Sequence, residues 1–151
     1  MRNTTLFFVL IFLISGCFSY SKNINKNGNQ LPPDIGKEKT ILWVVTHDNK
    51  KYDNYLKNCF SKYYNGEMVY IPFGTYPQKY RDNKVYRYQF DYITTGISID
   101  RNVTTEHRDF RIIDNLEQKT YQTDFQGFKW KDLMKAYVQK LEKLRIQNGG
   151  H

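Results

Sequence analysis

The amino-acid sequence predicts an α/β (α+β) two-layer sandwich, in which two helices cover one face of a mixed sheet of four or five strands. Three observations support this fold class. The run Ile41–Val45 is apolar throughout, as expected of a central strand. Two other segments repeat apolar residues at helical spacing, and residues 86–92 alternate aromatic and polar side chains. In chain order the elements are β-α-β-β-β-(β)-α.

A helix and a second strand are predicted after the first strand. Asp48 or Asn49 supplies an oxygen that can cap this helix, and Asn65-Gly66 ends it. Its apolar stripe consists of Tyr52, Tyr55, Leu56, Cys59, Phe60 and Tyr63. Met68–Ile71 forms the second strand, which Pro72 ends. This order favours a right-handed crossover that leaves the two strands parallel.

The second half of the domain is predicted to contain further strands and one long helix. Residues 95–105 are polar and are expected to form a connection whose tip could contact a partner. The last helix carries an apolar stripe opposite a lysine-rich face, and Asn148-Gly149-Gly150 ends it. The expected elements are strands at 86–92, 106–114 and 119–123, a turn at 115–118 and a helix from about 128 to 146.

The N-terminal segment has the pattern of a bacterial export signal. Arg2 precedes Leu6–Ile14, an unbroken apolar stretch of nine residues that is too short to span a bilayer. The following Ile14-Ser15-Gly16-Cys17 resembles the lipobox of bacterial lipoproteins. The resemblance implies cleavage before Cys17, diacylglycerol on its sulfur and acylation of its new amino group. It covers the first 17 residues, and the alternatives are an ordinary secretory signal or a short uncleaved anchor.

The predicted organisation has three parts: a signal peptide at 1–16, the lipidated Cys17 with a flexible tether at 17–39, and one globular domain at 40–148. The tether prediction rests on a polar composition without apolar periodicity. Phe18 stands where enteric lipoproteins retained in the inner membrane carry aspartate, so the resemblance implies an outer-membrane location facing the periplasm. The expected partners are the lipid bilayer, through Cys17, and an envelope protein.

His47 and Asp48 are the candidates for catalysis. They follow the first strand, at the edge where open α/β sheets bind ligands. His47 could act as a general base and Asp48 could bind an anion or a metal. Alternatively, Asp48 caps the helix and His47 is a partly exposed loop residue. None of the three histidines has metal-ligand spacing, and phosphate-binding loops are absent, so we expect no metal and no cofactor.

Residues 72–81 combine aromatic and basic side chains in a loop. They could bind a glycan or a peptide by stacking, or Pro72 and Pro77 could fold the loop back so that its aromatic rings cap the core. The candidate ligand-binding residues are Phe73, Tyr76, Lys79, Tyr80 and Arg81.

The formal charge of +8 fits a solvated surface or attraction to anionic lipid phosphates. Because no nucleic-acid-binding motif occurs, we expect no nucleic-acid partner. The leading hypothesis is a non-enzymatic, membrane-anchored envelope lipoprotein with a partner-binding or assembly domain. The alternatives are an envelope hydrolase or ligand-binding protein that uses His47 and Asp48, and a periplasmic glycan or peptide binder that uses the 72–81 loop.

Overall fold

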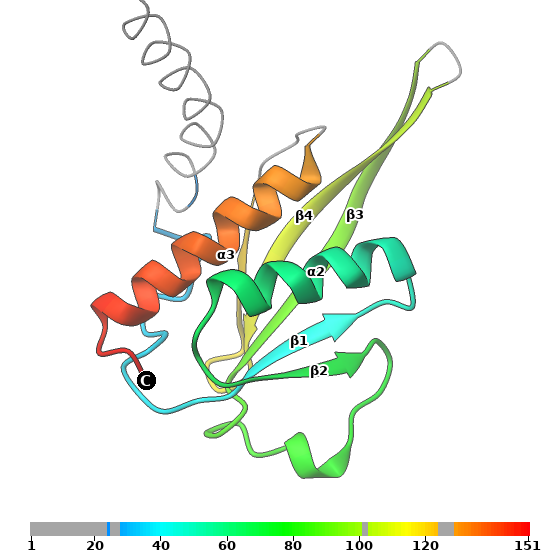
Figure 1. Cartoon of the computed structure of the whole chain (residues 1–151). Coiled ribbons are helices and arrows are strands. Elements are labelled where there is room, and N and C mark those ends of the chain that lie inside the picture. The colour runs from blue at the N-terminus through cyan, green and yellow to red at the C-terminus, as the bar shows by residue number, and fades with distance from the viewer. Residues whose placement is uncertain (1–23, 25–27, 101–102, 124–128) are drawn as a thin grey trace, which may run out of the picture.

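A computed structural model of the chain describes residues 24, 28–100, 103–123 and 129–151 (Figure 1). The predicted signal peptide at 1–16 and the lipidation site Cys17 lie outside the described residues. The elements are β1 (Leu42–Thr46), α2 (Lys50–Tyr63), β2 (Met68–Pro72), the short 3-10 helix η1 (Gln78–Tyr80), β3 (Tyr88–Asp100), β4 (Val103–Asp114), β5 (Lys119–Gln122) and α3 (Trp130–Gln147).

The predicted fold class is confirmed. One five-stranded mixed sheet has the order β2-β1-β3-β4-β5, and α2 and α3 lie together on one side of it (Figure 1). β1 pairs in parallel with both β2 and β3, whereas β3, β4 and β5 are antiparallel. Within the described part of the chain, neither helix combines the length and apolar character that a membrane span requires.

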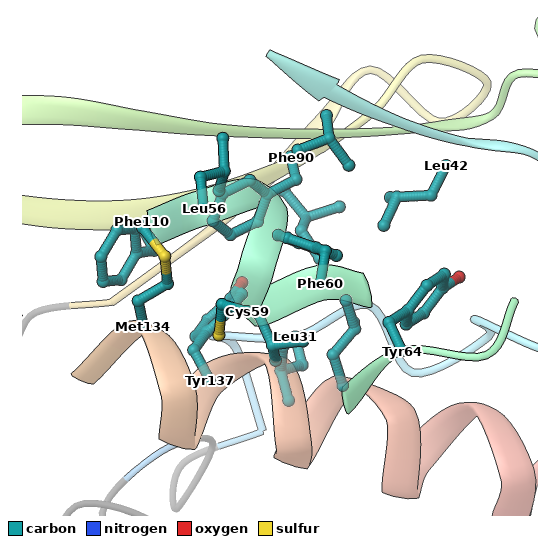
Figure 2. Packing of buried hydrophobic residues seen from close by; sticks show 14 of the residues in the cluster. Leu31, Leu42, Leu56, Cys59, Phe60, Tyr64, Phe90, Phe110, Met134 and Tyr137 are labelled. Atoms are coloured by element: carbon teal, nitrogen blue, oxygen red, sulfur yellow. The ribbon is translucent and has the colours of Figure 1, made fainter. Parts of the chain in front are cut away.

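The core lies between the sheet and the two helices. Figure 2 shows Leu56 of α2 and Met134 of α3 packed over the rings of Phe90 and Phe110. These two rings are fully buried and stack with centroids 5.8 Å apart. Alternate residues of a strand point to opposite faces, so Leu42 and Val44 of β1 also enter this core.

The cap of α2 also fixes the end of β1. Asn49, not Asp48, is the capping residue, and its side chain accepts a hydrogen bond from the Tyr52 N–H at 3.1 Å. The carboxylate of Asp53 accepts two more backbone bonds, from His47 N and Asn49 N, each at 3.1 Å. The first turn of the helix therefore holds the backbone that carries His47.

The described part of the predicted tether belongs to the folded domain, which corrects the expectation for 17–39. Leu31 and Ile35 are completely buried in the core, as is Ile24. Asn148 at the end of α3 donates to the carbonyls of Pro33 and Ile35 at 2.7 and 2.8 Å. These three apolar residues show no period in a polar segment, yet all of them belong to the buried core cluster.

Where a polar connection is expected at 95–105, residues 95–100 and 103–105 are strand. β3 continues to Asp100, β4 begins at Val103, and the two pair as a long hairpin that extends beyond the rest of the sheet (Figure 1). The register shifts once, between Thr94 and Gly96. β-Branched residues alternate with small and polar ones here, which suits a paired strand as well as a loop.

Candidate functional site

The second face of the sheet is crossed by the connection between β2 and β3, residues 73–87, which we call the connector. The step from β1 to β2 runs one way along the sheet, and the step from β2 to β3 runs back past β1. Connections of the same hand must then lie on opposite faces. Accordingly α2 covers one face, and the connector with η1 lies on the other (Figure 1).

The connector is attached to the sheet by three aromatic rings. Trp43 of β1 meets Tyr80 and Tyr86 edge to face, with centroids 5.7 and 6.2 Å apart. Tyr80 and Tyr86 meet each other at 4.9 Å in the same geometry. Such edge-to-face packing places the positive edge of one ring on the negative face of the next. Part of the predicted loop therefore does fold back over the sheet.

An open cavity of about 270 Å³ remains beside these rings. We call it the connector cavity. It is lined by Trp43, Tyr76, Tyr80, Arg81, Asn83, Gln89 and Asn115. The lining thus combines aromatic rings, primary amides and one guanidinium.

Two of the amides hold the cavity open in a fixed shape. Asn83 Nδ2 donates to the carbonyl of Asn115 at 3.1 Å, and Asn115 Nδ2 donates to the carbonyl of Tyr86 at 3.3 Å. These bonds tie the connector to the turn between β4 and β5. The side-chain NH₂ groups of Asn83 and Asn115 make these bonds, so the side-chain carbonyl oxygens of the two amides remain as hydrogen-bond acceptors.

The indole N–H of Trp43 is a buried hydrogen-bond donor. Its side chain is only 6% exposed, and its Nε1–H has no hydrogen-bond partner within the residues that the structure describes. A buried donor without an acceptor is destabilising by roughly 1–3 kcal/mol. The same side chain lines the connector cavity.

His47 lies where the sequence places it but has a different partner. It follows β1 directly, and its Nε2 lies 2.6 Å from Oδ1 of Asp91 on β3. Arg111 of β4 donates to Oδ2 of the same carboxylate at 2.8 Å. Asp91 is thus a buried carboxylate held between two basic side chains.

The crevice beside His47 is filled by the start of the connector. The ring of Phe73 stacks on His47 with centroids 4.8 Å apart, and Tyr92 contacts it at 4.3 Å. The cavity between the ends of β1 and β2 is only about 10 Å³, which is about the space of one water molecule. Phe73 and Tyr92 therefore cover the ring of His47 from the connector and from β3.

Asp48 does not join His47. Its side chain is exposed, and its backbone has a φ of +56°, which turns the chain between β1 and α2. Neighbouring residues on an extended chain point apart, so the adjacency of His47 and Asp48 does not make them a pair. No described group of three or more His, Cys, Asp and Glu residues is arranged to hold a metal ion.

The loop candidates divide into two sets. Tyr76, Tyr80 and Arg81 meet at the connector cavity, whereas Phe73 lies against His47. Phe73 and Tyr76 remain 62% and 63% exposed. Lys79 belongs to η1, but its side chain lies outside the described residues.

Several residues of the site were not predicted from the sequence. The sequence indicates Trp43 only as part of a buried strand, Gln89 as part of a polar strand face and Asn115 as part of a turn. The alternation in β1 and β3 does place Trp43 and Gln89 on one face, and their pairing register puts them side by side. No local pattern shows that Asn115 meets them.

No family model, no curated protein and no solved structure matches this chain.

Proposed function

We propose that this chain is a bacterial envelope lipoprotein, anchored by an acylated Cys17, whose domain binds an envelope component and is not an enzyme. The lipobox-like sequence supports the anchor. The observation that carries the binding function is the connector cavity, an aromatic and polar hollow on the sheet face opposite α2 and α3.

The exposed rings at the connector strengthen this proposal. Phe73 and Tyr76 leave most of their surface in water, although each ring would be stabilised by burial at roughly 25 cal/mol per Å² of apolar area. Aromatic side chains are enriched at binding surfaces, because they combine large apolar area with few rotatable bonds. A partner that covers this face would bury both rings.

The catalytic alternative has weaker support from the geometry. A general base must reach the proton of a substrate. Nε2 of His47 is engaged with Asp91, and Phe73 covers its ring, so a substrate would first have to displace the connector. The side chain of His47 is 17% exposed, which suits a contact that holds β1, β3 and the connector together.

The anchor is tested by mass spectrometry of the chain purified from membranes of its native host. We expect the mature N-terminus to be Cys17, carrying a diacylglyceryl group and an acyl chain. An unmodified N-terminus at another residue would overturn the lipoprotein assignment.

The binding face is tested by photocrosslinking in living cells. An aromatic photocrosslinker replaces Tyr76 at the cavity and, as a matched control, the exposed Gln139 on α3. We expect a defined adduct from position 76 that is absent from position 139. Equal labelling at both positions, or none at position 76, would contradict a binding site on the connector face.

A further inference from the structure

The connector cavity has the chemistry of a site for one sugar ring that bears a carboxylate. This inference rests on the proposed binding function and names the class of ligand. We propose that a carboxylated pyranose, either an acidic amino sugar of the cell wall or a uronic acid, binds there.

The aromatic residues supply a surface on which a sugar can stack. The C–H faces of a pyranose are apolar, and the rings of Trp43, Tyr76 and Tyr80 border the cavity from the sheet and the connector. Tyr76 is still largely exposed, so a ligand ring placed against it would remove apolar surface from water. A volume of about 270 Å³ is near the lower end of small-molecule sites and suits one ring rather than an extended chain.

The amides supply the polar contacts that sugar hydroxyls need. Gln89 reaches the cavity from β3, and its amide makes no hydrogen bond with the described residues. The carbonyl oxygens of Asn83 and Asn115 add acceptors whose positions are fixed by the bonds of their own NH₂ groups. An amide can donate to one hydroxyl and accept from its neighbour, so a rim of amides fits a polyol better than an apolar peptide side chain.

Arg81 specifies the charge of the ligand. Arg87 and Arg111 are held by the carboxylates of Asp114 and Asp91, each with an N–O distance of 2.8 Å. Arg81 lines the cavity, and no described carboxylate lies within ion-pair distance of it. A guanidinium binds a carboxylate through two parallel hydrogen bonds, which makes a carboxylate the complementary group.

Two pairs of sugars, each with an acidic and a neutral member, test whether the site prefers a carboxylate and which polymer supplies the ligand. N-Acetylmuramic acid is compared with N-acetylglucosamine, and methyl glucuronide with methyl glucoside. The full chain is kept in a detergent without a sugar headgroup. Trp130→Phe leaves Trp43 as the single tryptophan, which is excited at a wavelength where the thirteen tyrosines do not absorb. We expect saturable changes in Trp43 emission in the millimolar range, with a preference of about fivefold or more for an acidic sugar over its neutral counterpart.

Variants then assign the preference to the cavity. Arg81→Gln should remove the preference for acidic sugars, whereas Lys84→Gln, which removes an exposed charge from the same connector, should keep it. Tyr76→Ala should weaken the binding of acidic and neutral sugars alike. Preference for N-acetylmuramic acid identifies the cell wall as the source, and preference for the glucuronide identifies a uronic acid polysaccharide.

Equal binding of acidic and neutral sugars would overturn the role of Arg81, and no change in Trp43 emission with any sugar would overturn the sugar site itself. The crosslinking experiment separates these failures from that of the proposed function. If position 76 labels a protein while no sugar binds, the face is a binding site of another kind. If neither occurs, both proposals fail.

Discussion

At the scale of single residues, Cys59 is a test of how tightly the core is packed. It lies in α2 beneath α3, and its burial raises the pKa of the thiol to about 12. The thiolate is the reactive form, so almost none is present near neutral pH. We expect the native chain to react with a disulfide reagent at least about a hundredfold more slowly than the unfolded chain.

The number of thiols that react with the same disulfide reagent also tests the proposed lipid anchor. The chain has two cysteines. If the sulfur of Cys17 is in a thioether, as we propose, the unfolded chain should release one equivalent of chromophore, from Cys59. Two equivalents would indicate that Cys17 is unmodified. Rapid labelling of Cys59 in the native chain would contradict the packing of α2 against α3.

Glu142 is expected to stabilise the fold in a pH-dependent way. Burial raises its pKa, but hydrogen bonds from Arg145 and Asn65 outweigh this effect and hold the pKa below the ordinary value of 4.5. A carboxylate with a lowered pKa stabilises the fold above pH 4.5 and loses this contribution as the pH falls through its folded pKa. Glu142→Gln should therefore reduce the free energy of unfolding by about 2 kcal/mol at pH 7.

Urea unfolding at several pH values measures this difference. The difference in free energy of unfolding between the wild-type chain and Glu142→Gln should become smaller below pH 4.5. The reason is that Glu142 loses its charge there, whereas Gln does not titrate. Asp34→Asn is the control, since hydrogen bonding to Lys37 chiefly lowers the pKa of Asp34 while both side chains remain exposed. Solvent screening leaves such a pair worth less than about 1 kcal/mol. A gap that is constant with pH would contradict the Glu142 prediction.

His47 shows how much of a site can be deduced from one residue's neighbours. Its position at the end of β1 follows from the apolar run before it. Its partner Asp91 does not, because the two are 44 residues apart and meet only through the parallel register of β1 and β3. The residues around His47 and Asp91 contain no local signal for that register.

At the scale of elements, Gly36 determines whether the N-terminal segment can dock on α3. Its φ is +88°, and a Cβ added there would lie 2.3 Å from the carbonyl oxygen of Arg145. Gly28 has a φ of +74°, but a Cβ there would meet nothing within 4 Å. Gly28→Ala should be destabilising by about 1 kcal/mol, from backbone strain alone, and Gly36→Ala by about 3 kcal/mol or more.

Denaturant unfolding of the two variants measures this contrast. If residues 28–39 were a free tether, both substitutions would leave the free energy of unfolding unchanged. A loss confined to Gly36→Ala, or much larger there, would support the docked segment. Equal losses would show that the close approach to Arg145 contributes nothing.

The elements that the sequence predicts well are those with a strong local period. The stripe of α2 and the alternation from Tyr86 to Tyr92 need only short-range information. The N-terminal segment that docks on α3 and the long β3–β4 hairpin lack such a period, so the local sequence does not predict them. Leu31 and Ile35 have no periodic neighbours. Residues 95–100 and 103–105 form strand because pairing between β3 and β4 satisfies their backbone hydrogen bonds.

At the scale of the whole molecule, the reversal of strand order at β2 determines where the candidate site lies. It sends the connector across the face opposite the helices and fills the crevice beside His47 with Phe73. The cavity then forms where the connector passes Trp43 and meets Asn115. The residues 72–81 could be identified as candidates from composition, but the partners that complete the cavity come from two strands (Trp43 of β1 and Gln89 of β3), from the later part of the connector (Asn83) and from the turn after β4 (Asn115).

The docked N-terminal segment also limits how far the domain can stand from a membrane. Cys17 and Ile24 are seven residues apart, and Ile24 is buried in the core. Since an extended chain spans at most about 3.6 Å per residue, an acylated Cys17 would hold Ile24 within about 25 Å of the bilayer surface. Energy transfer from a dye on Ser61→Cys, placed in the Cys59→Ala background, to acceptor-labelled lipids would measure this separation.

A flexible Gly-Ser insertion between Cys17 and Ile24 provides the matched control for this reach. The end-to-end distance of such a linker grows with the square root of its length, so transfer efficiency should fall in steps as the insertion is lengthened. The uninserted chain should give the highest efficiency of the series. If its efficiency matched that of the longest insertion, Ile24 and Leu31 would have to leave the core in the membrane-bound state, and the segment would be the long tether that its composition suggests.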